Sequence, residues 1–132
     1  MNPTHYVPGV CNIGGAEIAA RKKAGWLGLI LTVIVWALLL VFNAGPVWYV
    51  LLLFGSALSA SGFIQARMHF CAAFGLKHLF NLNAEVGNVE RVLQKELWAA
   101  DRRKALQIGA YSLLVGMIVL IAGLVMKTLI RL

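Results

Sequence analysis

The side chains with the greatest chemical reactivity in this chain are two cysteines and a histidine. Cys11 lies near the N-terminus, while His69 and Cys71 lie two residues apart near the middle of the chain. Thiolate and neutral imidazole bind zinc, copper and iron. Residues two apart on a helix point in nearly opposite directions, so the three converge only if the N-terminal segment folds back. A metal or haem site at these residues is therefore an alternative hypothesis, and no spacing identifies a particular cofactor.

The sequence contains few side chains whose type and spacing could support catalysis. All four serines lie within uncharged stretches, where their hydroxyls commonly donate to backbone carbonyls. Proton relays and ion-coupled transporters need an ionisable group at mid-membrane, and the long uncharged stretches contain none. We therefore expect no catalytic residues, and we favour a protein that is not an enzyme.

These residues are positioned by a chain that is too apolar for water. Hydrophobic residues make up 61% of it and charged residues only 13%, whereas soluble domains have about a quarter charged. Residues 24–66 and 105–126 contain no Asp, Glu, Lys or Arg. Because one membrane-spanning helix needs about 20 apolar residues, the first stretch fits two spans and the second fits one. The sequence predicts one all-α membrane domain over 1–132, with spans at about 25–42, 47–65 and 105–126.

The segments between the predicted spans differ in length. Asn43, Ala44, Gly45 and Pro46 predict a tight turn that joins the first two spans as a hairpin. Residues 66–104 form the long connection to the third span. Here the second helix is expected to continue to about Phe74, and apolar residues at helical spacing predict an amphipathic helix over 84–105. We expect residues 1–13 to form a tail.

Most of the positive charge flanks the predicted spans on one side. The net charge is +7, and ten of the twelve Lys and Arg residues fall in two segments beside the spans. Such residues remain in the cytoplasm and attract anionic lipid headgroups, so this charge does not require a nucleic acid partner. The pattern predicts a cell inner-membrane protein with a cytoplasmic tail, linker and amphipathic helix, and a periplasmic or extracellular C-terminus. The predicted headgroup contacts are Arg21, Lys22, Lys23, Arg67, Arg102, Arg103 and Lys104.

Small residues at regular spacing predict where the helices pack. Lipid tails are as apolar as leucine, so helices associate in a membrane where small side chains allow close approach. The second and third spans are expected to pack together through such stripes, or one stripe could drive self-association. The predicted packing residues are Gly55, Ser59, Gly62, Gly109, Ser112, Gly116 and Gly123.

Together these features favour an accessory or assembly subunit of the membrane. It would act through contacts with partner helices and anionic lipids, as a homo-oligomer or within a larger complex. One alternative is a metal- or haem-binding redox protein that uses Cys11, His69 and Cys71. A second alternative is a homo-oligomeric pore or channel, because a chain of this length is too short to form a pathway alone.

Overall fold

The structure is a computed structural model that describes residues 5–130. It confirms three helices long and apolar enough to cross a membrane. Residues 1–4 of the predicted tail, and the C-terminal residues 131–132, lie outside the described residues. The long helices, with the 3-10 turns that precede two of them, are α1 (Gly15–Val41), η1 (Pro46–Tyr49), α2 (Val50–Met68), η2 (Lys95–Leu97) and α4 (Trp98–Ile130).

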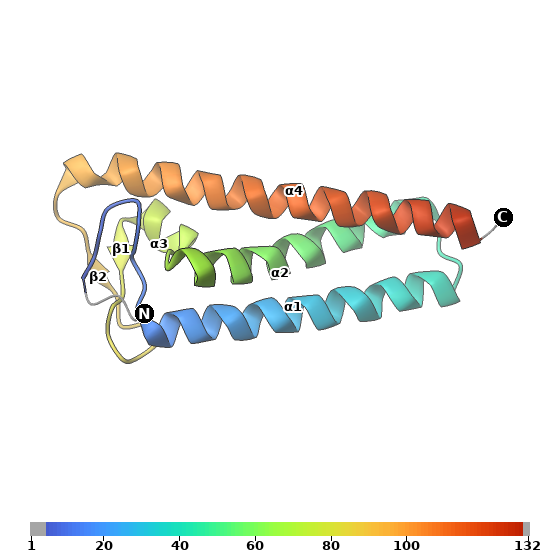
Figure 1. Cartoon of the computed structure of the whole chain (residues 1–132), viewed down its shortest axis with the longest axis horizontal. Helices are drawn as coiled ribbons and strands as arrows, with labels where there is room; N and C mark the ends of the chain where they lie inside the picture. Colours follow the sequence, from blue (N-terminus) through green and yellow to red (C-terminus); the bar gives the residue numbers. More distant parts are fainter. Residues whose placement is uncertain (1–4, 131–132) are drawn as a thin grey trace.

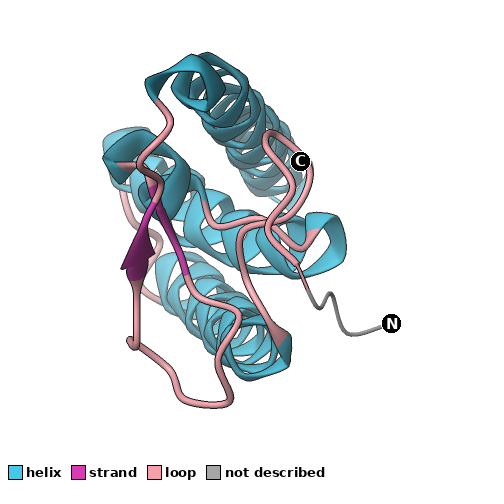
Figure 2. Cartoon of the chain, turned by 90° about the vertical axis from the view of Figure 1, so that its left-hand side faces the viewer, coloured by secondary structure: helices cyan, strands magenta, loops and turns pink. Residues whose placement is uncertain are grey.

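The three long helices lie side by side, with α2 between α1 and α4 (Figures 1 and 2). We call the end formed by residues 5–14 and 69–97 the polar end, and the end formed by residues 42–49 the hairpin end. The predicted hairpin is confirmed: α1 ends at Val41, and Asn43 turns the chain with a left-handed φ of 50°. At about 1.5 Å per residue α4 is about 50 Å long, which exceeds a hydrocarbon layer of about 30 Å.

The small residues of α2 pack against α1. The Ser59 Oγ donates a hydrogen bond of 2.7 Å to the carbonyl oxygen of Gly25. A Cβ added to Gly62 would lie 2.7 Å from the Gly25 nitrogen, and one added to Gly55 would lie 2.7 Å from Thr32 Oγ1. Backbones this close leave no room for a side chain. The stripe of α2 therefore faces the first helix, whereas the sequence pattern placed it against the third.

The small residues of α4 meet a different side of α2. A Cβ on Gly116 would lie 2.8 Å from the Leu53 carbonyl oxygen, and one on Gly123 would lie 2.7 Å from Leu52 Cδ1. Ser112 is buried, and its hydroxyl donates to the Ile108 carbonyl of its own helix. Gly109 differs from the expectation, because nothing lies within 4 Å of an added Cβ there. The central helix thus uses two sides, one for each neighbour.

The second helix ends earlier than predicted. It stops at Met68, because His69 adopts a left-handed conformation with φ of 53°. A short helix, α3 (Ala72–Lys77), then runs through Gly75. The N-terminal segment supplies the hydrogen bonds that replace the helix: the Asn12 N–H donates to the His69 carbonyl at 3.1 Å. The expectation of one helix to Phe74 is wrong for this reason.

The amphipathic helix predicted between the second and third spans is absent over 84–97. This part contains turns, β2 (Glu90–Arg91) and η2, and helix begins only at Trp98. β2 pairs antiparallel with β1 (Leu79–Phe80). Asparagine side chains explain the loop, since Asn81 Nδ2 donates to the Glu85 carbonyl and thereby competes with helical hydrogen bonds. The apolar spacing was misleading: Val92 is 4% exposed but its neighbour Leu93 is 85% exposed.

The outer surface of the bundle is apolar. In the most apolar part of α1 and of α4 only 17% of the residues are buried, and in α2 the share is 28%. Large side chains such as Leu31, Leu58 and Ile121 are exposed. Water does not tolerate an apolar surface this extensive on a monomer, but lipid does.

Candidate functional site

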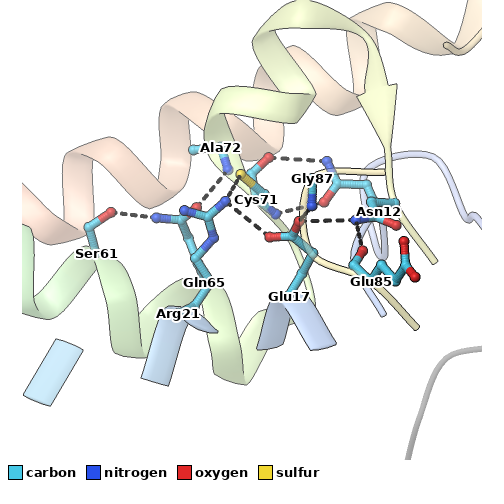
Figure 3. Close-up of polar contacts among 10 residues, drawn as sticks. Asn12, Glu17, Arg21, Ser61, Gln65, Cys71, Ala72, Glu85 and Gly87 are labelled. Atoms are coloured by element: carbon cyan, nitrogen blue, oxygen red, sulfur yellow. Dashed lines mark hydrogen bonds and ion pairs between the residues drawn. The ribbon is translucent and has the colours of Figure 1, made fainter. Parts of the chain in front are cut away.

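A buried carboxylate organises the polar end. Glu17, in the first turn of α1, is 2% exposed. Its Oε1 accepts hydrogen bonds from Asn81 Nδ2 at 3.0 Å and from the Gly87 N–H at 2.8 Å. Its Oε2 lies 3.5 Å from Arg21 Nη2, one turn along the same helix (Figure 3). These contacts compensate for removing the charge from water.

Asn12 joins the N-terminal segment to the break between α2 and α3. Its side-chain Oδ1 accepts from the Cys71 N–H at 2.6 Å, and its Nδ2 donates to the Cys71 carbonyl at 3.1 Å (Figure 3). In this way one amide side chain bonds to both backbone groups of Cys71, whose carbonyl also accepts from the Gly75 N–H at 2.9 Å. Gln65 supports the same break, since its Oε1 accepts from the Ala72 N–H at 3.0 Å.

A second buried carboxylate, Asp101, binds the N-terminal segment to α4. Asp101 is 0% exposed, although Arg102, Arg103 and Lys104 follow it directly in the sequence. Its Oδ2 accepts from the Tyr6 hydroxyl at 2.7 Å and its Oδ1 accepts from the Gly9 N–H at 2.8 Å. Burial, and then the hydrogen bond to Asp101 and the charge of that carboxylate, raise the pKa of Tyr6 well above its usual range.

The three candidate metal ligands, Cys11, His69 and Cys71, all lie at the polar end. Each thiol contacts a group there other than the candidate ligands. Cys71 is buried, and its Sγ lies 3.2 Å from Arg21 Nη2. The Cys11 Sγ lies 3.7 Å from the Ile13 carbonyl, and burial raises the pKa of the Cys11 thiol, which opposes the thiolate that metals bind. His69 lines a separate cleft. Within residues 5–130, no three His, Cys, Asp or Glu residues form a group that could hold a metal ion.

The cleft beside His69 combines basic and aromatic side chains. We call it the basic cleft; it has a volume of about 760 Å³ and lies between α1 and the end of α2. Lys22 and Arg67 are exposed at it, and His69 is partly buried. Below them, Trp26 and Phe63 meet edge to face with ring centroids 5.5 Å apart. Ile18 and Ala66 complete the lining.

The other predicted headgroup residues lie in different places. Arg21 points into the polar network, toward Glu17 and Cys71 (Figure 3). Lys23 is exposed and does not line the basic cleft. Arg102 and Arg103 line a smaller cleft on α4 beside the stacked rings of His78 and Trp98, and Arg103 and Lys104 line another beside Pro8 and Gly9.

Sequence reasoning found the charges of the cleft but missed the network that holds the polar end together. Asn12 lies two residues before Gly14, the residue that precedes α1, and it bonds to Cys71. Asn81 is 0% exposed and bonds to Glu17, and no spacing in the sequence indicates either partner. The signal for this network in the sequence is an acidic residue, Glu17, placed four residues before the basic segment Arg21 to Lys23.

No protein-family model, curated protein or solved structure matches this chain. A functional assignment therefore depends on the residues of the chain itself.

Proposed function

We propose that this chain is a non-enzymatic membrane subunit that binds anionic phospholipid headgroups at the basic cleft and packs against partner helices in the bilayer. The observation that carries the proposal is the composition of that cleft. Lys22 and Arg67 present positive charge above Trp26 and Phe63. A phospholipid offers the complementary pair of groups, since a phosphate meets the cations and the start of an acyl chain meets the rings.

The position of the cleft along the helices supports this assignment. Tryptophan is enriched where hydrocarbon meets headgroups, and Trp26 is 59% exposed one turn beyond Lys22. At the hairpin end Trp48 is 61% exposed. The two rings thus mark the two boundaries of an apolar band, and the basic cleft lies at one boundary.

The charge distribution supports an orientation. Basic residues gather at the polar end, on α1 before Gly25, at Arg67, and on α4 before Ala105. Because basic loops remain in the cytoplasm, we place the polar end there, in a membrane of the bacterial inner-membrane type. This orientation puts the hairpin end and the end of α4 on the opposite side.

Partner association follows from surfaces that α2 does not cover. α1 and α4 each contact α2 and leave outward faces of large apolar residues. Either a second copy of this chain or another membrane subunit can cover such a face. The buried polar network would hold the three helices in a fixed arrangement for that contact.

Headgroup binding is tested by neutralising the cleft. We expect the double variant Lys22→Gln/Arg67→Gln to lose about thirtyfold in affinity for phosphatidylglycerol, or about 2 kcal/mol, because a phosphate bound in the cleft then lacks a direct ion pair with each side chain. Native mass spectrometry in phosphatidylcholine with graded phosphatidylglycerol measures it. The matched control is Lys77→Gln/Arg91→Gln, which removes the same charge from exposed residues outside the cleft and should lose only the weaker long-range attraction. An equal loss of affinity in both double variants would contradict a specific site, because it would show that the cleft attracts anionic lipid only through the overall positive charge.

A further inference from the structure

We infer that the basic cleft continues into an apolar groove between α1 and α4, and that this groove holds one acyl chain of the bound phospholipid. The site would then take a whole anionic lipid rather than its headgroup alone. This inference rests on the proposed function and specifies its ligand. The observation that supports it is the apolar groove, a second hollow that a headgroup alone would not occupy.

The groove lies over α2, closer to the hairpin end than the basic cleft. It has a volume of about 370 Å³. One wall is formed by Leu29, Val33 and Trp36 of α1, and the other includes Ile118 and Ala122 of α4. The middle helix lies between the two outer helices (Figures 1 and 2). Leu52 and Ser56 of α2 form the floor of the groove.

The two hollows open on the same side of the molecule. On α1 the cleft uses Ile18, Lys22 and Trp26, and the groove uses residues 29, 33 and 36. Successive members of this series are three or four residues apart, so they share one face of the helix. On α2 the residues 52, 56, 63 and 67 form a matching line. A molecule that leaves the cleft along this face therefore enters the groove.

The distance between the hollows matches a lipid in one leaflet. Lys22 and Val33 are separated by about 16 Å along the helix axis, at about 1.5 Å per residue. Half of a hydrocarbon layer of about 30 Å is about 15 Å. With the headgroup at Lys22, an extended acyl chain would therefore pass beside Val33.

The lining selects hydrocarbon. Two hydroxyl groups occur there, and both are occupied by their own helix: Thr32 Oγ1 donates to the Gly28 carbonyl at 2.7 Å and Ser56 Oγ donates to the Leu52 carbonyl. The groove consequently presents carbon to its contents. Because the surrounding lipid is equally apolar, the gain from the groove comes from the van der Waals contacts of a chain that fits it, and not from removing methylene groups from water.

The position of the groove favours an acyl chain over a partner helix. The groove begins within one helical turn of the basic cleft, since Trp26 lines the cleft and Leu29 lines the groove. An apolar partner helix offers nothing to the cations of the cleft. An anionic phospholipid supplies a phosphate to the cleft and an acyl chain to the groove.

The inference is tested by filling the groove while leaving the cleft intact. Ala122 lines the groove, whereas Ala110 of the same helix is exposed outside it. We expect Ala122→Phe to weaken phosphatidylglycerol binding about tenfold, because the ring takes the space of the chain and removes its van der Waals contacts, and Ala110→Phe to leave binding unchanged. Native mass spectrometry with phosphatidylglycerol as the probe gives both affinities.

The possible results separate this inference from the proposed function. If Ala122→Phe binds like the unmodified protein while Lys22→Gln/Arg67→Gln loses affinity, the acyl-chain inference is overturned and headgroup binding stands. If neither variant loses affinity, both are overturned. If Ala122→Phe fails to fold, phosphatidylglycerol brominated at mid-chain is added to the unmodified protein in vesicles. We expect it to quench the tryptophan emission more than brominated phosphatidylcholine at the same fraction. Because the chain has four tryptophans, the same comparison is made in Trp36→Phe, where we expect this excess to be lost. Equal quenching by the two lipids, or an excess that persists in Trp36→Phe, would overturn the inference.

Discussion

Glu17 and Asn81 lie 64 residues apart in the chain and meet at the polar end, where Asn81 Nδ2 donates to Glu17 Oε1 at 3.0 Å. The same oxygen accepts from the Gly87 N–H, and the same amide donates to the Glu85 carbonyl. Through this pair the start of α1 fixes the loop that connects the second and third long helices. Asn81 also joins the N-terminal segment by its backbone, since its N–H donates to the Asn12 carbonyl.

Neutralising this carboxylate should destabilise the polar end. Glu17→Gln keeps one acceptor oxygen but removes the charge and places an amide donor beside Arg21. We expect a loss of about 1.5–3 kcal/mol in the free energy of unfolding, the usual size for a hydrogen bond to a charged group. Chemical unfolding in mixed micelles measures this loss. Glu96→Gln is the matched control on an exposed residue, and a loss of equal size there would contradict a special role for Glu17.

A second substitution should release the N-terminal segment from α4. Asp101→Ala removes the acceptor of both the Gly9 N–H and the Tyr6 hydroxyl. Residues 6–10 should then exchange their amide hydrogens faster, while the amides in the middle of α4 keep their protection. Hydrogen–deuterium exchange with peptide mapping follows both regions at once. Unchanged exchange at Gly9 would show that other contacts hold the segment.

Alkaline pH should loosen the same contact. The pKa of Tyr6 is raised above its ordinary value of 10.0, so the folded protein retains the phenol proton more strongly than the unfolded chain does. The stabilisation is therefore complete below about pH 10 and is lost as the pH rises further, because only the unfolded state then gains from ionisation. The free energy of unfolding should fall less steeply above pH 10 in Tyr6→Phe than in the unmodified protein. Tyr111→Phe, which removes an exposed phenol, should retain the steep fall.

The long helices could be predicted from the sequence because long uncharged stretches are a strong and local feature. Two uncharged stretches exceed the length of a span, and the turn at Asn43 to Pro46 divides the first one. The sequence was insufficient for the polar end, where the elements are held by side chains far apart in the chain. Asn12 bonds to Cys71, and Asp101 bonds to Gly9, at separations that no periodicity encodes.

The connection between the second and third long helices shows why apolar residues at helical spacing wrongly predicted a helix there. Val86, Val89 and Val92 recur every three residues, as they would on a helix. Gly87 has a φ of 86°, and the Asn83 Nδ2 donates to the Asn88 carbonyl, so turns interrupt this segment. The small-residue stripes were likewise visible in the sequence, but their partners depend on which side of α2 each neighbour occupies.

The thiol of Cys11 should react slowly and only at high pH. It is 5% exposed, and burial raises its pKa above the ordinary value of 9.0, so little thiolate is present near neutrality. In a Cys71→Ser background, we expect alkylation by iodoacetamide to accelerate continuously through pH 9 and beyond. A plateau at or below pH 9 would contradict the shift. In protein that retains Cys71, protection of Cys11 by micromolar Zn²⁺ that disappears in His69→Ala would instead support the metal-site alternative.

Packing of the three helices should depend on which glycine is changed. A Cβ at Gly62 would lie within 2.8 Å of backbone atoms of Arg21 and Gly25, and backbone can move only by separating α1 from α2. Gly62→Ala should therefore cost about 1–3 kcal/mol, as other overpacked sites do. Gly109→Ala adds the same methyl group to open space and should leave stability unchanged or raise it by up to about 1 kcal/mol, because alanine favours the helix over glycine. Thermal or chemical unfolding of the two variants in the same micelles compares them. A cost at Gly109 as large as the cost at Gly62 would indicate that α4 packs there against a second chain, which is where a homo-oligomer would first become visible.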